Sequence, residues 1–84
     1  MRKAALVMGS ASDYPVMEKA EKTLAAYGLP FETHVLSAHR SPEALREFAE
    51  GAQGAGIGVI IAAAGKAAHL AGVIASYTTL PVIG

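Results

Sequence analysis

Four short apolar runs divide this chain into segments of mixed polarity. The runs at residues 4–8 and 59–64 are wholly apolar, which is typical of parallel strands buried on both faces. Residues 31–36 alternate before the run becomes apolar, which predicts a second strand that is less buried than the first. Residues 80–83 predict a fourth strand.

Between these runs, apolar residues recur at helical spacing, with charged residues on the opposite side. We expect a first helix after residues 9–13, where Ser12 or Asp13 can cap it and Pro15 suits its first turn. Gly28 is placed to end this helix. The apolar stripe of the helix consists of Val16, Met17, Ala20, Leu24 and Tyr27.

Two further helices are predicted in the same way. Ser41 is a natural N-cap for the second helix, and Pro42 fits its first position. The glycine-rich region 51–58 ends this helix, and a short third helix runs through residues 73–76. The apolar stripe of the second helix consists of Leu45, Phe48, Ala49 and Ala52.

Strands that alternate with helices predict an α/β fold in the order βαβαβαβ, with a parallel sheet in three layers. The 84 residues amount to one small domain, residues 1–84. The fourth strand stops at once and leaves an apolar edge. We therefore expect either assembly with another chain or a longer protein of which this is a part.

The amino-acid composition narrows the classes of partner and site that we expect for this chain. The formal net charge is zero, so we expect neither nucleic acid nor a membrane surface as a partner, and any anion must be recognised locally. The sequence has no cysteine, which excludes disulfides and thiolate metal sites. The N-terminal apolar run is too short to span a membrane and lacks a signal-peptide cleavage pattern, so we expect a cytoplasmic protein.

The first turn, Gly9-Ser10-Ala11-Ser12-Asp13, brings backbone N–H groups and two hydroxyls to a helix N-terminus. This arrangement suits a phosphate or another anion. The turn matches neither the dinucleotide-binding glycine motif nor the Walker A phosphate-binding loop of proteins that bind nucleoside triphosphates. The alternative is that Ser12 and Asp13 only cap the helix. If the turn does bind a ligand, Asp13 suits a ribose hydroxyl, because a phosphate would repel it.

The second turn, Ser37-Ala38-His39-Arg40-Ser41-Pro42, follows the second predicted strand. His39 can move protons near neutral pH, and the adjacent Arg40 can grip a phosphate or carboxylate with two donors. The carboxyl ends of parallel strands are where ligands bind in open α/β sheets. The alternative is an ordinary solvated turn.

The third turn, residues 65–72, is apolar and rich in glycine apart from Lys66 and His69. We expect a polar partner or a ligand beside His69, although a satisfied, half-buried histidine is the more frequent outcome. Lys66 is a weak candidate for a phosphate contact, and His34, in the middle of a strand, is assigned no role. The three histidines lie on separate elements without a carboxylate cluster, so we expect no metal site.

Together the three turns resemble one family, the N5-carboxyaminoimidazole ribonucleotide mutases, also called the phosphoribosylaminoimidazole carboxylase catalytic subunit family. The resemblance covers essentially the whole chain and corresponds to the N-terminal half of the family. The matching stretches are Met8-Gly9-Ser10-Ala11-Ser12-Asp13, Ser37-Ala38-His39-Arg40-Ser41-Pro42, Ala64-Gly65 with Ala67-Ala68-His69-Leu70, and Leu80-Pro81-Val82-Ile83-Gly84. The sequence departs from the family at Ala63 and Lys66, where glycine is usual, and at Ala71, where proline is usual.

The resemblance implies a flavodoxin-like fold and a homo-octamer whose active sites lie at subunit junctions. It implies an isomerase of de novo purine biosynthesis that interconverts N5-carboxyaminoimidazole ribonucleotide and 4-carboxy-5-aminoimidazole ribonucleotide, without metal or organic cofactor. By the same resemblance His39 is the general acid and base. The implied substrate-binding residues are Ser10, Ser12, Asp13, Ser37 and Arg40 around the ribotide, and Ala64, Gly65, His69 and Leu70 around the CO2 and carboxylate.

Three alternatives remain open at the level of sequence. The first is a carboxylase of the same family that adds free CO2 directly to aminoimidazole ribonucleotide. The second is a truncated, non-catalytic fragment or assembly unit that keeps the motifs by inheritance. The third is a flavin-binding relative, which is the weakest because aromatic loops suited to stacking on a flavin are not evident.

Overall fold

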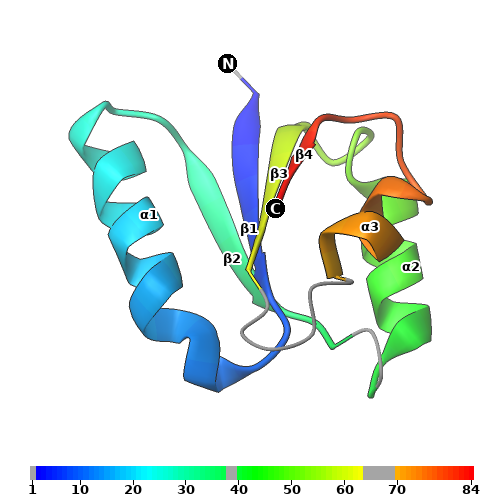
Figure 1. Cartoon of the computed structure of the whole chain (residues 1–84). Helices are drawn as coiled ribbons and strands as arrows, with labels where there is room; N and C mark the ends of the chain where they lie inside the picture. Colours follow the sequence, from blue (N-terminus) through cyan, green and yellow to red (C-terminus); the bar gives the residue numbers. More distant parts are fainter. Residues whose placement is uncertain (1, 38–39, 64–69) are drawn as a thin grey trace.

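The computed structural model describes residues 2–37, 40–63 and 70–84. Within these residues, strands and helices alternate as the apolar pattern predicts, and a single 3-10 turn precedes the first helix (Figure 1). In chain order the elements are β1 (Lys3–Met8), η1 (Ala11–Asp13), α1 (Tyr14–Ala26), β2 (Phe31–Val35), α2 (Pro42–Gly51), β3 (Ile57–Ala63), α3 (Leu70–Ala75) and β4 (Val82–Ile83).

The strands form one parallel sheet in the order β2-β1-β3-β4. Helix α1 covers one face of this sheet, and helices α2 and α3 cover the other (Figure 1). The predicted three-layer α/β fold is therefore confirmed. The chain steps outward from β1 to β2 and then crosses back to β3, so the strand order reverses between β1 and β3. This is the flavodoxin-like order, in which ligands bind outside the carboxyl ends of the strands at the reversal.

Two apolar clusters hold the layers together. The larger lies between the sheet and helices α2 and α3, and its fully buried members are Ala5, Val7, Leu45, Ala49, Ala52, Ile57, Ile60, Ala62, Leu70 and Ile74. The smaller lies under α1, and its buried members are Leu6, Met8 and Met17. Strand β1 contributes alternate residues to both clusters, which confirms that it is buried on both faces.

The prediction of a doubly buried third strand is only half right. In β3, Ile60 and Ala62 face α2 and α3 and are buried, whereas Val59, Ile61 and Ala63 on the opposite face are partly exposed. The cause is the placement of α1, which packs chiefly against β1 and leaves its side of β3 incompletely covered. Strand β2 is less buried than β1, as predicted, but its burial does not alternate: residues 31–34 are all partly buried, and Val35, on the expected apolar face, is exposed.

The apolar stripe predicted for the first helix is wrong at two positions. Met17 is buried and Ala20 and Leu24 pack beside it, but Val16 is 65% exposed and Tyr27 is 78% exposed. Successive helical residues lie about 100° apart, so Val16 points away from the face that Met17 presents to the sheet. Tyr27 lies beyond the last helical residue, next to Gly28, whose φ of 70° ends the helix as expected.

Several element boundaries differ from the sequence-based expectation for identifiable reasons. Strand β3 begins at Ile57 because Gly56 turns the chain with a φ of 89° and its carbonyl accepts from the N–H of Lys3 at 3.0 Å. Strand β4 is shorter than residues 80–83, since the N–H of Leu80 donates to Thr78 Oγ1 at 3.2 Å and Pro81 has no N–H.

Across the described ranges, no helix combines the length and the apolar character that a membrane crossing needs.

Candidate functional site

The carboxyl ends of the first three strands lie level with one another. Met8 pairs with Val35 of β2 and with Ala63 of β3. Beyond Met8, the N–H of Gly9 donates to the carbonyl of Ala63 at 3.2 Å, and the N–H of Leu36 donates to the carbonyl of Met8 at 2.8 Å. The first and second turns therefore leave the sheet side by side at the carboxyl ends of the strands, and the first turn also borders the reversal between β1 and β3, where ligands are expected.

The first turn is held by its own hydroxyls and carboxylate. Ser10 is the N-cap of the 3-10 turn and makes the capping hydrogen bonds. Its Oγ accepts from the N–H of Ser12 at 3.3 Å, and its own N–H donates to Asp13 Oδ2 at 3.2 Å, which completes a capping box. Asp13, one of the two expected caps, occupies the N-cap position of α1, but its side chain makes no capping hydrogen bond there. A 3-10 turn inserted before α1 moves the start of the helical segment back to Ala11, and this shift makes Ser10 the cap.

This capping does not use up the hydroxyl groups of the first turn. The Oγ atoms of Ser10 and Ser12 lie 3.0 Å apart, and both residues are exposed. A pair of hydroxyls at the start of a helix can donate to the oxygens of an anion. The carboxylate of Asp13, by contrast, already accepts a backbone hydrogen bond.

The second turn is stabilised by Ser37. Its Oγ accepts from the N–H of Arg40 at 3.1 Å, and its carbonyl accepts from the N–H of Ser41 at 3.0 Å. Ser41 occupies the N-cap of α2 as predicted, but its side chain makes no capping hydrogen bond. Arg40 is exposed at this point, where a guanidinium can reach an anion. His39 lies outside the described residues.

Most of the third turn, including Ala64, Gly65 and His69, also lies outside the described residues. Leu70 is described: it begins α3, is 3% exposed and packs in the larger cluster with Val7 and Ile74. Its side chain is therefore part of the core. Among the described residues, no group of three or more His, Asp or Glu side chains is arranged to hold a metal ion.

One polar cluster near the first turn was not predicted from the sequence. Glu21, which the helical pattern assigns to the solvent face of α1, accepts from Tyr14 OH at 2.7 Å and from Thr33 Oγ1 at 2.5 Å. The hydrogen bond from Thr33, and then that from Tyr14, lowers the pKa of Glu21, and the same Glu21 carboxylate raises the pKa of Tyr14. The spacing of Tyr14 and Glu21, about two helical turns, is the only sequence signal for this contact.

A second polar cluster lies on the opposite face of β2. Glu32 accepts from Lys3 Nζ at 2.7 Å and lies 2.9 Å from His34 Nε2, and the His34 ring packs 4.7 Å from that of Phe48. The ammonium group of Lys3, followed by His34, lowers the pKa of Glu32. These contacts link β1, β2 and α2, which gives His34 a structural role.

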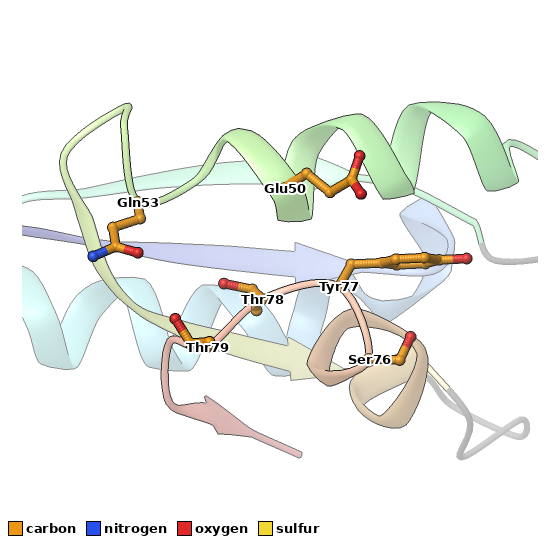
Figure 2. Close-up of a pocket in the computed structure, with 6 residues that line it drawn as sticks. All are labelled: Glu50, Gln53, Ser76, Tyr77, Thr78 and Thr79. Carbon is orange, nitrogen blue, oxygen red and sulfur yellow. The ribbon is translucent and has the colours of Figure 1, made fainter.

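A hollow of about 380 Å³ lies at the other end of the sheet, between the end of α2 and the segment that leads into β4 (Figure 2). Three of its lining residues already use polar groups within the protein: Ser76 Oγ donates to Val73, Thr78 Oγ1 accepts from Leu80, and Glu50 accepts from Arg46. This hollow is separate from the three turns. The lining residues are Glu50, Gln53, Ser76, Tyr77, Thr78 and Thr79.

Comparison with known proteins gives a consistent result. The AIR carboxylase family model matches residues 3–84. The chain is 56% identical over 79 residues to the N5-carboxyaminoimidazole ribonucleotide mutase of Pyrococcus horikoshii, a match that covers 94% of this chain and 45% of that protein. It is 50% identical over 84 residues to the mutase of Thermotoga maritima, covering 100% of this chain and 49% of that protein.

The chain thus spans about half the length of the curated relatives it matches. Among solved structures, PurE of Treponema denticola aligns with a TM-score of 0.84 and 23% identity, covering 95% of this chain and 51% of that chain. This structural likeness supports the fold. Because the family model extends over nearly every residue, the chain belongs to the AIR carboxylase family.

Proposed function

We propose that this chain forms the ribonucleotide-binding part of an N5-carboxyaminoimidazole ribonucleotide mutase, an isomerase of purine biosynthesis. The observation that carries the proposal is the 56% identity to a curated mutase over 94% of the chain. The sheet edge that carries Ser10, Ser12 and Arg40 supports it, because exposed hydroxyls and a guanidinium there suit a phosphorylated ligand.

In this proposal the first two turns bind the ribotide. Ser10 and Ser12 donate to the phosphate and ribose end, and Arg40 grips the phosphate. Asp13 accepts a hydrogen bond from a ribose hydroxyl through Oδ1, because its Oδ2 already accepts from the backbone N–H of Ser10. Ser37 contacts the substrate while its Oγ holds the backbone of the second turn.

His39 is the proposed acid and base. In its protonated form it gives a proton to the carbamate nitrogen, the C–N bond breaks, and CO2 is released. The ring carbon then attacks CO2, and neutral His39 removes the proton from that carbon, which restores the starting protonation state. One histidine therefore balances the proton transfers, and the proposed reaction calls for no metal or organic cofactor.

The third turn is the proposed pocket for CO2 and the carboxylate. Ala64, Gly65 and His69 line it, and Leu70 supports it from the core, where its side chain is buried. A small, dry pocket keeps released CO2 beside the ring carbon, which favours recarboxylation over escape. We further propose that the protein works in the cytoplasm as a homo-octamer, which would cover exposed apolar residues such as Ile83, 55% exposed on β4.

Two substrates test this function. The full-length protein is incubated either with N5-carboxyaminoimidazole ribonucleotide alone or with aminoimidazole ribonucleotide plus bicarbonate, and formation of the 4-carboxy product is followed. Turnover of the first substrate without bicarbonate supports the mutase. Turnover only of the second would assign the protein to direct carboxylation instead, and failure with both would indicate a non-catalytic chain.

A further inference from the structure

We propose that Glu21 is a positioning residue for the ribonucleotide site, an inference that rests on the proposed function. Its carboxylate joins Tyr14, the first residue of α1, to Thr33 in the middle of β2. Tyr14 OH donates to Oε1 at 2.7 Å and Thr33 Oγ1 donates to Oε2 at 2.5 Å. We call these three side chains the Glu21 clamp.

The clamp acts on the first turn through Tyr14. Tyr14 directly follows Asp13, and its backbone N–H donates to the carbonyl of Ala11, so it forms the end of the 3-10 turn. When Tyr14 is held, the backbone that carries Ser12 and Asp13 is held with it. Displacing the Tyr14 ring would therefore move the hydroxyl and carboxylate that the proposed site uses.

Apolar packing alone anchors this end of α1 weakly. Met17 is the fully buried residue of the helix, and the neighbouring Val16 is 65% exposed. The first turn of the helix thus has a single deep apolar contact with the sheet. The Glu21 clamp supplies a second point of attachment, on β2, to one side of the cluster around Met17.

The clamp also helps to fix the distance between the first turn and the second turn. Thr33 lies on β2, and β2 leads directly to Ser37 and Arg40. A ligand gripped by Ser12 on one turn and by Arg40 on the other depends on the distance between the two turns. Since the clamp links the start of α1 to the strand that precedes Arg40, loosening it relaxes that distance and weakens binding of the ribotide more than the proton transfer.

A carboxylate is suited to this position because two donors converge on it. Each oxygen accepts one hydroxyl, and hydrogen bonds to an ionised acceptor are stronger than those between neutral groups. The Thr33 and Tyr14 hydrogen bonds both favour the charged form, which lowers the pKa of Glu21. Glutamine retains one accepting oxygen and adds a donor, so Glu21→Gln keeps part of the clamp, whereas Glu21→Ala removes it.

The test compares KM and kcat of the full-length protein with N5-carboxyaminoimidazole ribonucleotide. For Glu21→Ala we expect KM to rise about three- to tenfold, as for loss of one or two exposed hydrogen bonds, with kcat within about twofold of wild type. Tyr14→Phe and Thr33→Val, which each remove one hydroxyl donor, should produce smaller increases, and Glu21→Gln should recover part of the loss. The matched control is Glu18→Ala, which removes an exposed carboxylate one turn after Tyr14 on the same helix.

Amide hydrogen exchange at Ser12 and Asp13 gives a readout that does not depend on activity. Loss of the clamp should speed exchange at these two positions in Glu21→Ala and leave it unchanged in Glu18→Ala. If wild type turns over neither substrate, the proposed function fails, and the exchange result alone then decides whether the clamp holds the turn. If wild type is active but Glu21→Ala, Tyr14→Phe and Thr33→Val all keep the wild-type KM, the positioning role is wrong. If Glu21→Ala does not fold, the two hydroxyl deletions decide the question.

Discussion

The backbone N–H of Gly9 donates to the carbonyl of Ala63 at 3.2 Å, so the turn that follows β1 starts directly beside the end of β3. On the other side, Leu36 donates to Met8, which brings the end of β2 to the same level. The residues proposed to bind the ribotide therefore emerge from neighbouring strands at one edge of the sheet.

Capping and ligand binding can be separated in the first turn. Ser10→Ala removes the N-cap and should lower the free energy of unfolding by about 0.5 to 2 kcal/mol. Ser12→Ala leaves the capping oxygen in place and should change the free energy of unfolding by less than about 0.5 kcal/mol. Both variants should weaken binding of the ribotide. Denaturant unfolding and titration calorimetry measure the two effects, and normal ribotide binding in both variants would show that the turn only caps the helix.

Arg40 is expected to act through its charge and its planar guanidinium. Arg40→Ala should raise KM about tenfold or more, as expected when a hydrogen bond to a charged group is lost. Arg40→Lys should recover part of the binding, because lysine supplies the charge but not the paired donors. Arg46→Ala, which removes an exposed guanidinium from α2, is the control. An unchanged KM in Arg40→Ala would remove Arg40 from the site.

Truncating an apolar side chain to alanine should lower the free energy of unfolding much more at Leu45 on α2 than at Val16 on α1. Leu45 is fully buried between α2 and the sheet, so Leu45→Ala should cost about 2 to 5 kcal/mol of unfolding free energy. Val16, predicted from sequence to be in the core, is 65% exposed, and Val16→Ala should cost less than about 0.5 kcal/mol. Equal losses at the two positions would contradict the packing of α1 described above.

Acid should destabilise the fold partly through Glu32. Lys3, and then His34, lowers the pKa of Glu32 from its ordinary value of 4.5. Because the folded-state pKa is the lower one, this stabilisation is complete above pH 4.5 and is lost as the pH falls through the folded-state value. Glu32→Gln should therefore make the melting temperature less dependent on pH in the acid range. Glu47→Gln, at an exposed position on α2, should leave the wild-type slope unchanged, and a wild-type slope in Glu32→Gln would refute this role.

The sequence predicts most of the fold because local signals and burial agree. Strand β1, which is apolar from Ala4 to Met8, lies in the interior of the sheet, and Gly28 ends α1 as expected. The errors arise where the tertiary structure selects among equivalent residues. Ser10, Ser12 and Asp13 are all good caps, and the inserted 3-10 turn gives the capping hydrogen bond to Ser10, while Asp13 holds the N-cap position of α1 without one.

The sequence predicts which turns form the candidate site, but it does not predict the side-chain contacts that hold those turns in place. Ser12 and Arg40 could be assigned to the same sheet edge because both follow strands of a parallel sheet. The contact of Glu21 with Thr33 could not be predicted, because it depends on how α1 is placed across β2. The roles proposed for His39, Ala64, Gly65 and His69 rest on the family resemblance, since these residues lie outside the described ranges.

The most direct test of the proposed mutase follows the carboxyl carbon. Full-length protein is given N5-carboxyaminoimidazole ribonucleotide labelled with 13C in the carbamate, in the presence of unlabelled bicarbonate, alongside the variant His39→Asn. The account predicts that the 4-carboxy product of wild type keeps the label, because CO2 stays in the pocket between the two steps, and that His39→Asn forms almost no product. Product that carries unlabelled carboxyl from bicarbonate, or a His39→Asn variant that retains the wild-type rate, would contradict it.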